Sequence, residues 1–258
     1  DTEAAAFFDI DNTLIQGSSL ILLAQGLFTK RFITLRELAP ALWKQIRFRV
    51  SGSENADDIA QGREQALAVV KGKSVDELKE ACQEIVDKQM LNKSYSDVIE
   101  LASMHIAAGQ QVWLVSATPV QIGQALAETL GFTGALGTVA EEEDGKFTGR
   151  LVGDILHGPG KKHAVAALAA LQQLDLKQCT AYSDSINDLP MLEMVGSPVA
   201  VNPDLALRRH AKAQGWAIRD YRPVRRAVRL SALPVLGAAG AFSLWRLWSK
   251  RQDRTHHA

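Results

Sequence analysis

Residues 6–15 read Ala-Phe-Phe-Asp-Ile-Asp-Asn-Thr-Leu-Ile, an apolar run that ends in two acids spaced one residue apart. A strand buried on both faces of a parallel sheet reads as a continuous apolar stretch, and ligands of such sheets bind outside the carboxyl ends of the strands. Asp9 and Asp11 are therefore predicted to lie at a ligand site. Side chains at i and i+2 of an extended chain share one side, so both carboxylates can face one Mg²⁺, which prefers oxygen ligands. The alternative is that the acids only end a strand and cap the next helix.

A second apolar strand is predicted at Gln111–Ser116, and it is followed by Ala117, Thr118 and Pro119. Proline suits the first position of a helix. The Ser116 hydroxyl and the amides of such a helix start would bind a phosphate oxygen. An equally good interpretation makes Ser116 or Thr118 a simple helix cap.

A glycine-rich turn, Gly158-Pro159-Gly160-Lys161-Lys162-His163, opens an alanine-rich helix that is predicted to run through Leu174. Lys161, at the start of this helix, would place a fixed positive charge beside a phosphate. Most lysines are solvated surface residues, so this residue alone carries little weight.

Residues 179–192 again form a short strand that ends in acids, with Asp184 and Asp188 four residues apart across a turn into a helix. Asp188 alone would be an ordinary helix cap. A second acidic strand end beside the first favours a metal site with oxygen ligands instead.

These four segments resemble the motifs of the haloacid dehalogenase superfamily, and most closely its phosphoserine-phosphatase-like branch, subfamily IB. The resemblance covers roughly residues 4–220. It includes Asp9-x-Asp11-x-Thr13, Ser116, Lys161 and Asp184-x-x-x-Asp188, together with the hairpin-like stretch 143–149 and Val-Ala-Val-Asn-Pro at 199–203.

The resemblance implies an aspartyl-phosphate mechanism. Asp9 would be the nucleophile that takes the phosphoryl group, which divides one difficult displacement into two easier ones. Asp11 would protonate the leaving alkoxide and later accept a proton from the attacking water.

The same resemblance assigns the binding residues. Mg²⁺ would be held by the Asp9 carboxylate, the Asp11 backbone carbonyl and Asp184, with Asp188 supporting these ligands from behind. The transferring phosphoryl oxygens would be bound by Ser116 and Lys161, with Asn187 assisting.

The fold is predicted to be α/β, a doubly wound parallel sheet with an inserted helical cap and a C-terminal hydrophobic helix. Residues 1–16 and 92–220 would form the core domain, and residues 17–91 the helical cap. Apolar residues recur at helical spacing in four stretches of that insertion, with Ser74 and Glu77 as a capping box: Ser18–Leu27, Thr34–Val50, Asp57–Val70 and Ser74–Lys88. The core elements predicted after residue 116 are Val120–Leu130, Lys162–Leu174, Thr180–Ser183, Ser197–Val201 and Pro203–Gln214.

The substrate is predicted to be a small phosphomonoester, phosphoserine by default. In phosphoserine phosphatases a glutamate shortly after the first motif meets the substrate ammonium, whereas this chain has Gln16-Gly17-Ser18-Ser19 and no acid before Glu37. An unpaired buried cation is costly, so this departure weakens the case for phosphoserine. Arg63 would bind the substrate carboxylate if the resemblance extends to the cap, and a solvated surface arginine is the alternative.

Composition excludes nucleic acid as the expected partner, because 29 basic and 29 acidic residues balance and no nucleic-acid-binding signature is present. The two cysteines, Cys82 and Cys179, lie far apart without metal-type spacing, which indicates a reducing compartment.

Residues 221–258 form a basic-flanked hydrophobic segment, within which Leu230–Trp245 carries no charge. Its length is near the lower limit of about 17–25 residues for spanning a bilayer. Arginines before it, further basic residues after it, and Trp245 with Trp248 favour membrane attachment over a buried helix. We therefore expect a cytoplasmic catalytic domain tethered to the cell membrane.

Three functions follow from the sequence. The first is a Mg²⁺-dependent phosphomonoesterase that acts on a small metabolite. The second is a membrane-associated phosphatase of a lipid or lipid-precursor phosphate, and the third is a phosphate-sensing regulatory module without turnover.

Overall fold

The computed structural model describes residues 3–34 and 67–222. The chain divides into two units, Asp1–Arg219 and Asp220–Ala258. All of the helices and strands described below belong to the first unit.

The core is a six-stranded sheet in which every neighbouring pair of strands is parallel. All four residues of the central strand β1 are buried, which explains its continuous apolar sequence. The strands follow the order β3 (Gly134–Thr138), β2 (Gln111–Pro119), β1 (Ala5–Phe8), β6 (Thr180–Ser183), β7 (Ser197–Val201) and β8 (Ala217–Arg219).

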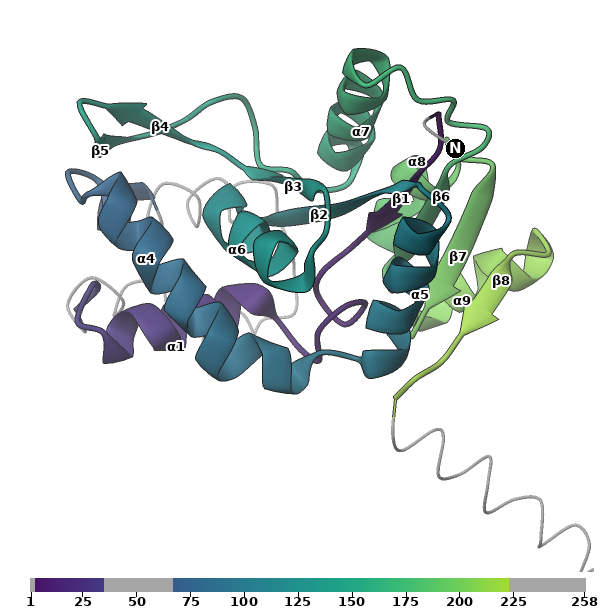
Figure 1. Ribbon diagram of the computed structural model, residues 1–258, viewed down its shortest axis with the longest axis horizontal. Coiled ribbons are helices and arrows are strands. Elements are labelled where there is room, and N and C mark those ends of the chain that lie inside the picture. Colours follow the sequence, from purple (N-terminus) through teal and green to yellow (C-terminus); the bar gives the residue numbers. More distant parts are fainter. Residues whose placement is uncertain (1–2, 35–66, 223–258) are drawn as a thin grey trace, which may run out of the picture. The chain divides into compact units, whose positions relative to one another are not determined.

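Helices cover both faces of this sheet (Figure 1). On one face α7 (Pro159–Leu171), α8 (Leu189–Leu192) and α9 (Leu205–Ala213) contribute buried residues to a core cluster with Phe7, Ala181 and Ala200 of the sheet. The other face carries α5 (Ser96–Ala107) and α6 (Val120–Leu130). The connections from β1 to β2 and β3 run across the sheet in the opposite direction to those from β6 to β7 and β8, so right-handed crossovers place their helices on opposite faces. The predicted doubly wound α/β fold is confirmed.

The two faces of β1 pack against different partners, because successive side chains of a strand point to opposite sides of the sheet. Phe7 enters the core cluster on one side, whereas Phe8 stacks on Tyr182 of β6 with ring centroids 4.2 Å apart on the other. The Tyr182 hydroxyl lies 2.7 Å from Nε2 of His105 in α5. Both faces of the strand that leads to Asp9 are therefore fixed by packing.

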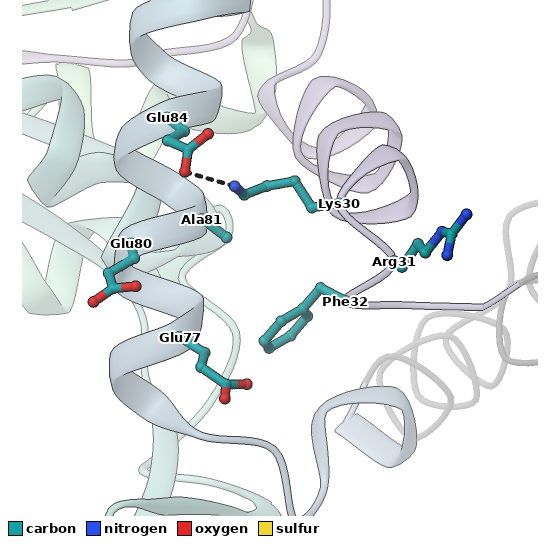
Figure 2. A pocket seen from close by; sticks show the side chains of 7 residues that line it. All are labelled: Lys30, Arg31, Phe32, Glu77, Glu80, Ala81 and Glu84. Carbon is teal, nitrogen blue, oxygen red and sulfur yellow. Dashed lines mark ion pairs between the residues drawn. The ribbon is translucent and has the colours of Figure 1, made fainter.

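The predicted cap segment contains two described helices that pack against each other, α1 (Ser19–Thr29) and α4 (Val75–Ile85). A Cβ placed on Gly26 would lie 2.3 Å from Cγ1 of Ile85, so any larger residue here would displace the buried Ile85 side chain. Lys30 binds Glu84 across the two helices at 2.7 Å (Figure 2). The Ser74 hydroxyl accepts a hydrogen bond from the Glu77 amide, which is one half of the predicted capping box.

The chain continues from α4 into a π-helical turn, Val86–Met90, and a short 3₁₀ turn, Leu91–Lys93. The remaining predicted cap helices, Thr34–Val50 and Asp57–Val70, lie outside the described residues except for residue 34 and residues 67–70, and the latter are helical. The division of the first unit into a core and a cap stays a prediction.

The hairpin-like stretch 143–149 is a hairpin, formed by β4 (Ala140–Glu143) and β5 (Lys146–Leu151). Its second strand pairs with the chain that precedes α4. The amide of Gly72 donates to the Phe147 carbonyl at 2.8 Å, and the amide of Phe147 donates to the Lys73 carbonyl at 3.1 Å. Phe147 is buried, so the hairpin is anchored on the predicted cap segment rather than free in solvent.

Several predicted boundaries are wrong in detail. The helix expected to run through Leu174 starts at Pro159 and ends at Leu171, because Gln173 adopts a left-handed conformation with φ 55°. The helix expected from Pro203 starts at Leu205, with Asp204 as its N-cap. The strand expected to end at Ser116 continues to Pro119, and the edge strands β3 and β8 were not predicted because their sequences are short and weakly apolar.

Gly196, at the entrance to β7, provides a stability test. A Cβ at this position would lie 1.7 Å from the Lys177 carbonyl oxygen, and the Gly196 amide donates to the Leu176 carbonyl at 2.9 Å. The clash is with backbone, so Gly196→Ala is expected to destabilise the protein by about 1–3 kcal/mol in urea unfolding. The neighbouring exposed Ser197→Ala should change the stability by less than about 0.5 kcal/mol, and equal effects of the two would contradict this packing argument.

Candidate active site

The site begins where β1 and β6 end side by side. The Asp9 amide donates to the Tyr182 carbonyl at 2.9 Å, which places the residue after β1 next to the end of β6. Asp9 is only 5% exposed. Its Oδ2 accepts a hydrogen bond from the Thr13 hydroxyl at 3.3 Å, and its Oδ1 accepts one from Lys161 Nζ at 2.6 Å.

Lys161 joins the two acidic motifs. It lies in the first turn of α7, and its Nζ donates to Asp9 Oδ1 at 2.6 Å and to Asp188 Oδ2 at 2.7 Å. All three side chains are buried, so the lysine is not a solvated surface residue. The Ser183 hydroxyl donates to the same Asp188 oxygen at 2.7 Å. Segments that are far apart in the sequence thus meet around one ammonium group.

Asp184 and Asn187 lie in the loop after β6, which includes the short 3₁₀ helix Ile186–Asp188. Asp184 is partly buried, whereas Asn187 is exposed. The Asn187 carbonyl lies 3.6 Å from the place that a Cβ on Gly158 would take, so this loop borders the turn that precedes α7. The backbone of this loop therefore lies near the start of the helix that carries Lys161, and the predicted roles of Asp184 and Asn187 stay predictions.

Asp11 has a local structural role as well. Its Oδ1 accepts hydrogen bonds from the amide, at 2.9 Å, and from the hydroxyl of Ser19, the first residue of α1. Ser18, the N-cap of α1, makes no side-chain cap, so Asp11 supplies the negative charge favoured at that helix start. The capping interpretation of the first motif thus applies to Asp11, and it does not apply to Asp9.

Ser116 lies at the same edge of the sheet as Asp9, because Phe8 of β1 is paired with Leu114 of β2. Its hydroxyl is buried, lies 2.9 Å from the Thr118 hydroxyl and accepts a hydrogen bond from the Thr118 amide. The residue before α6 is Pro119, so the simple helix-cap interpretation of Ser116 and Thr118 is wrong. Arg63 lies outside the described residues.

The electrostatics of the site show an excess of negative charge. Burial raises the pKa of Asp9 to about 7; the Lys161 ammonium opposes this rise, and the carboxylates of Asp188 and Asp184 add to it. Burial also raises the pKa of Asp184 to about 7, with further contributions from Asp188, Asp204 and Asp11. One ammonium does not neutralise this group of carboxylates.

A divalent cation fits this oxygen-rich donor set, because a second positive charge would relieve the repulsion. Within residues 3–34 and 67–222, no group of three or more His, Cys, Asp or Glu side chains has the arrangement of a metal site. Two of the carboxylates predicted for the metal site, those of Asp9 and Asp188, contact the Lys161 ammonium. The assignment of Mg²⁺ ligands stays a prediction.

The raised pKa values predict how the metal-free protein responds to pH. A carboxyl whose pKa is higher in the folded state than in the unfolded state lowers stability when ionised, and that loss disappears as the pH falls through the folded pKa. The metal-free protein should therefore become more stable as the pH falls from 8 towards 5.

Asp184→Asn should raise the stability of the metal-free protein at pH 8 and flatten this pH dependence. Urea unfolding in a chelator at both pH values measures the effect. Asp175→Asn is a matched control, because the pKa of Asp175 is lowered by its bonds to Gln178 and Lys177. An Asp184→Asn protein less stable than wild type at pH 8 would count against the crowded-carboxylate interpretation.

Some residues of the site were not predicted. Asn202 and Asp204 follow β7 and bond to the loops that carry Asp11 and Asp184. The stretch 199–203 was noted only as part of the family likeness, and an Asp before a helical pattern reads as a plain N-cap. Only the parallel pairing of β7 with β6 brings these residues to the site.

Two cavities lie away from this cluster. One, of about 270 Å³, lies between the end of α1 and α4 and is lined by Lys30, Arg31, Phe32, Glu77, Glu80, Ala81 and Glu84 (Figure 2). The other, of about 530 Å³, lies between the β4–β5 hairpin and residues 67–71. Neither is lined by a predicted catalytic residue, so the buried charge cluster and not a cavity defines the candidate site.

The part of the chain that the structure describes contains no helix with the length and apolar character needed to cross a membrane. The predicted attachment segment, Leu230–Trp245, lies outside the described residues. Membrane attachment therefore stays a prediction.

Comparison with known proteins identifies the family. The chain belongs to the haloacid dehalogenase-like hydrolase family, whose model matches residues 6–193. Phosphoserine phosphatase SerB1 of Mycobacterium tuberculosis (strain ATCC 25618 / H37Rv) is 52% identical over 257 residues, which cover 98% of this chain and 83% of that protein. Histidinol-phosphatase of Neisseria meningitidis serogroup C (strain 8013) is 30% identical over 221 residues, which cover 84% and 98% respectively.

A solved structure of a protein with unknown function from Bordetella pertussis Tohama I matches with a TM-score of 0.74 at 30% identity, covering 86% of this chain and 100% of that one. The predicted family and enzyme class are confirmed: the chain is a phosphatase of the phosphoserine-phosphatase-like branch.

Proposed function

We propose that this chain is a Mg²⁺-dependent phosphomonoesterase that transfers the phosphoryl group of a small metabolite to Asp9 and then to water. The observation that supports the proposal most strongly is the buried Lys161 ammonium, 2.6 Å from Asp9 and 2.7 Å from Asp188. A fixed positive charge next to the attacking carboxylate would stabilise the negative charge on the transferring phosphoryl oxygens.

In the first step, an Asp9 carboxylate oxygen attacks phosphorus, the bond from phosphorus to the ester oxygen breaks, and Asp11 protonates the departing alkoxide. In the second step, water attacks the aspartyl-phosphate, Asp11 accepts the proton of that water, and phosphate leaves with the Asp9 carboxylate restored. Ser19 holds Asp11 through Oδ1, which keeps the other oxygen for the proton.

The other site residues would bind the phosphoryl group and neutralise its negative charge. Lys161 and Ser116 would hold the phosphoryl oxygens, with Asn187 at the exposed rim of the same loop as Asp184. Mg²⁺, held by Asp9, the Asp11 carbonyl and Asp184 with support from Asp188, would neutralise the charge of the transferring group.

The substrate is proposed to be a phosphorylated amino acid or amino alcohol. One relative is named a phosphoserine phosphatase and another a histidinol-phosphatase, and their substrates both carry an amine. In this chain the residues before α1 are Gln16, Gly17 and Ser18 instead of an acid for that amine, and the buried Ser19 hydroxyl is bonded to Asp11. A lipid or lipid-precursor phosphate is the second candidate, motivated by the uncharged segment 230–245.

A substrate panel tests the proposal. We expect Mg²⁺-dependent release of phosphate from phosphoserine or histidinol phosphate, complete loss of release in a chelator, and recovery when Mg²⁺ is returned. Hydrolysis of lipid phosphates alone would establish the second candidate and exclude the first. Failure to hydrolyse any monoester, together with binding of a phosphate analogue, would indicate a sensing module and overturn the proposed function.

A further inference from the structure

Asn202, at the end of β7, reaches the first catalytic loop from 190 residues away in the sequence. Its Nδ2 donates to the Asn12 carbonyl at 2.9 Å. Asn202 is 1% exposed, and its own amide donates to the Arg219 carbonyl in β8 at 2.7 Å. The backbone of Asn202 is therefore fixed to the sheet, and its side chain extends from there to the loop.

The carbonyl that Asn202 contacts belongs to the peptide bond between Asn12 and Thr13, directly after Asp11. Asn12 itself is left-handed, with φ 55°, and its amide and side chain both bond to Gly17, which closes residues 12–17 into a loop. This loop places Thr13, which donates to Asp9. The hydrogen bond from Asn202 to the Asn12 carbonyl therefore also influences the orientation of Asp11 and Thr13, the residues on either side of Asn12.

Asp204, two residues further, makes the equivalent connection to the second acidic loop. Its amide donates to the Asp184 carbonyl at 2.8 Å, and its Oδ2 accepts from the Ile186 amide at 2.9 Å. Its Oδ1 accepts from the Leu207 amide at the start of α9. The turn Asn202-Pro203-Asp204 thus connects the loops of Asp11 and Asp184 to the same strand end.

We infer that Asn202 is a positioning residue, which fixes the loop of Asp9 and Asp11 relative to the loop of Asp184 through the turn 202–204. The inference rests on the proposed function, because it assigns these two loops to one reaction. Positioning errors of about 1 Å at such a centre cost rate without unfolding the protein.

The test uses two variants that remove the donor in different ways. Asn202→Asp keeps the shape and tolerates the left-handed backbone, φ 48°, that Asn202 adopts, whereas Asn202→Gly removes the side chain without adding charge. Both variants of the full chain should lose about 10–100-fold in kcat with little change in KM. Deuterium exchange at amides 12–17 should rise in both, without a general rise across β2.

Leu174 provides the control for a merely structural effect. It belongs to the core cluster, and the amide of Asp175 beside it donates to the Glu3 carbonyl before β1, at the opposite end of that strand from Asp9. Leu174→Val or Leu174→Ala, whichever matches the Tm of the Asn202 variants, should leave kcat unchanged.

A kcat loss no larger than that of the Leu174 control, or unchanged exchange at residues 12–17, would overturn the inference. A loss in Asn202→Asp without one in Asn202→Gly would also overturn it, because the added charge would then explain the defect. If wild-type protein hydrolyses no phosphomonoester, the proposed function fails, whereas the exchange measurement still decides whether Asn202 holds the loop.

Discussion

Asp9→Asn is expected to lower kcat on the order of 10⁴-fold or more, with the fold unchanged. An amide nitrogen or oxygen at this position cannot accept the phosphoryl group as a carboxylate does, so no aspartyl-phosphate forms. The substitution is nearly isosteric, and Lys161 keeps its contact with Asp188. Because burial raises the pKa of Asp9 to about 7, removing this charge should not destabilise the metal-free protein at pH 8.

The experiment measures kcat and also traps the aspartyl-phosphate intermediate. Borohydride should reduce the acyl phosphate of wild-type protein, and mass spectrometry should locate the product at Asp9. Asp175→Asn is the matched control, because it makes the same chemical change at a residue whose amide bonds to Glu3, before β1, and it should retain full activity. An Asp9→Asn enzyme with near wild-type kcat, or a trapped adduct on another residue, would refute the assigned nucleophile.

The sequence was sufficient to predict the four inner strands of the sheet and to single out the charged residues of the candidate site. Strand β1 is buried on both faces, so its apolar run and the acids after it could be recognised directly. The strands at 180–183 and 197–201 were predicted with their observed bounds, although neither is buried along its whole length. Lys161 lies beside both acidic motifs in the structure, where it bonds to Asp9 and Asp188, whereas its predicted contact with the phosphoryl group stays a prediction.

The sequence was insufficient to predict residues that bond to the backbone of a loop far away in the chain. Asn202 contacts Asn12 only because β7 pairs with β6 and β6 pairs with β1, and no local pattern carries that information. Asp11 shows a related difficulty. Its contact with Ser19 is a helix cap, and the same carboxylate also contributes to the raised pKa of Asp184. The capping role is therefore compatible with the predicted role of Asp11 in the reaction, which stays a prediction.

Lys161→Met should have the largest effect on stability, because it leaves the carboxylates of Asp9 and Asp188 buried without their cation. Breaking a buried ion pair by removing one partner costs about 3–5 kcal/mol. We expect a loss of this size at pH 8 in a chelator, and loss of turnover. The pKa of Lys161 is raised by both carboxylates, so the lysine stays charged in wild-type protein throughout the range from pH 5 to pH 8.

The loss should shrink at pH 5. The pKa of Asp9, already raised to about 7, rises further without the ammonium, so the folded variant binds a proton that the unfolded chain does not, and stability recovers as the pH falls. Lys161→Arg keeps the charge and should restore more stability than activity, since the planar guanidinium differs in shape from an ammonium. Lys88→Met removes an exposed partner of Glu84 and should cost far less stability than Lys161→Met. If Lys161→Met is as stable as wild type at pH 8, the buried ammonium is not what holds the two acidic motifs together.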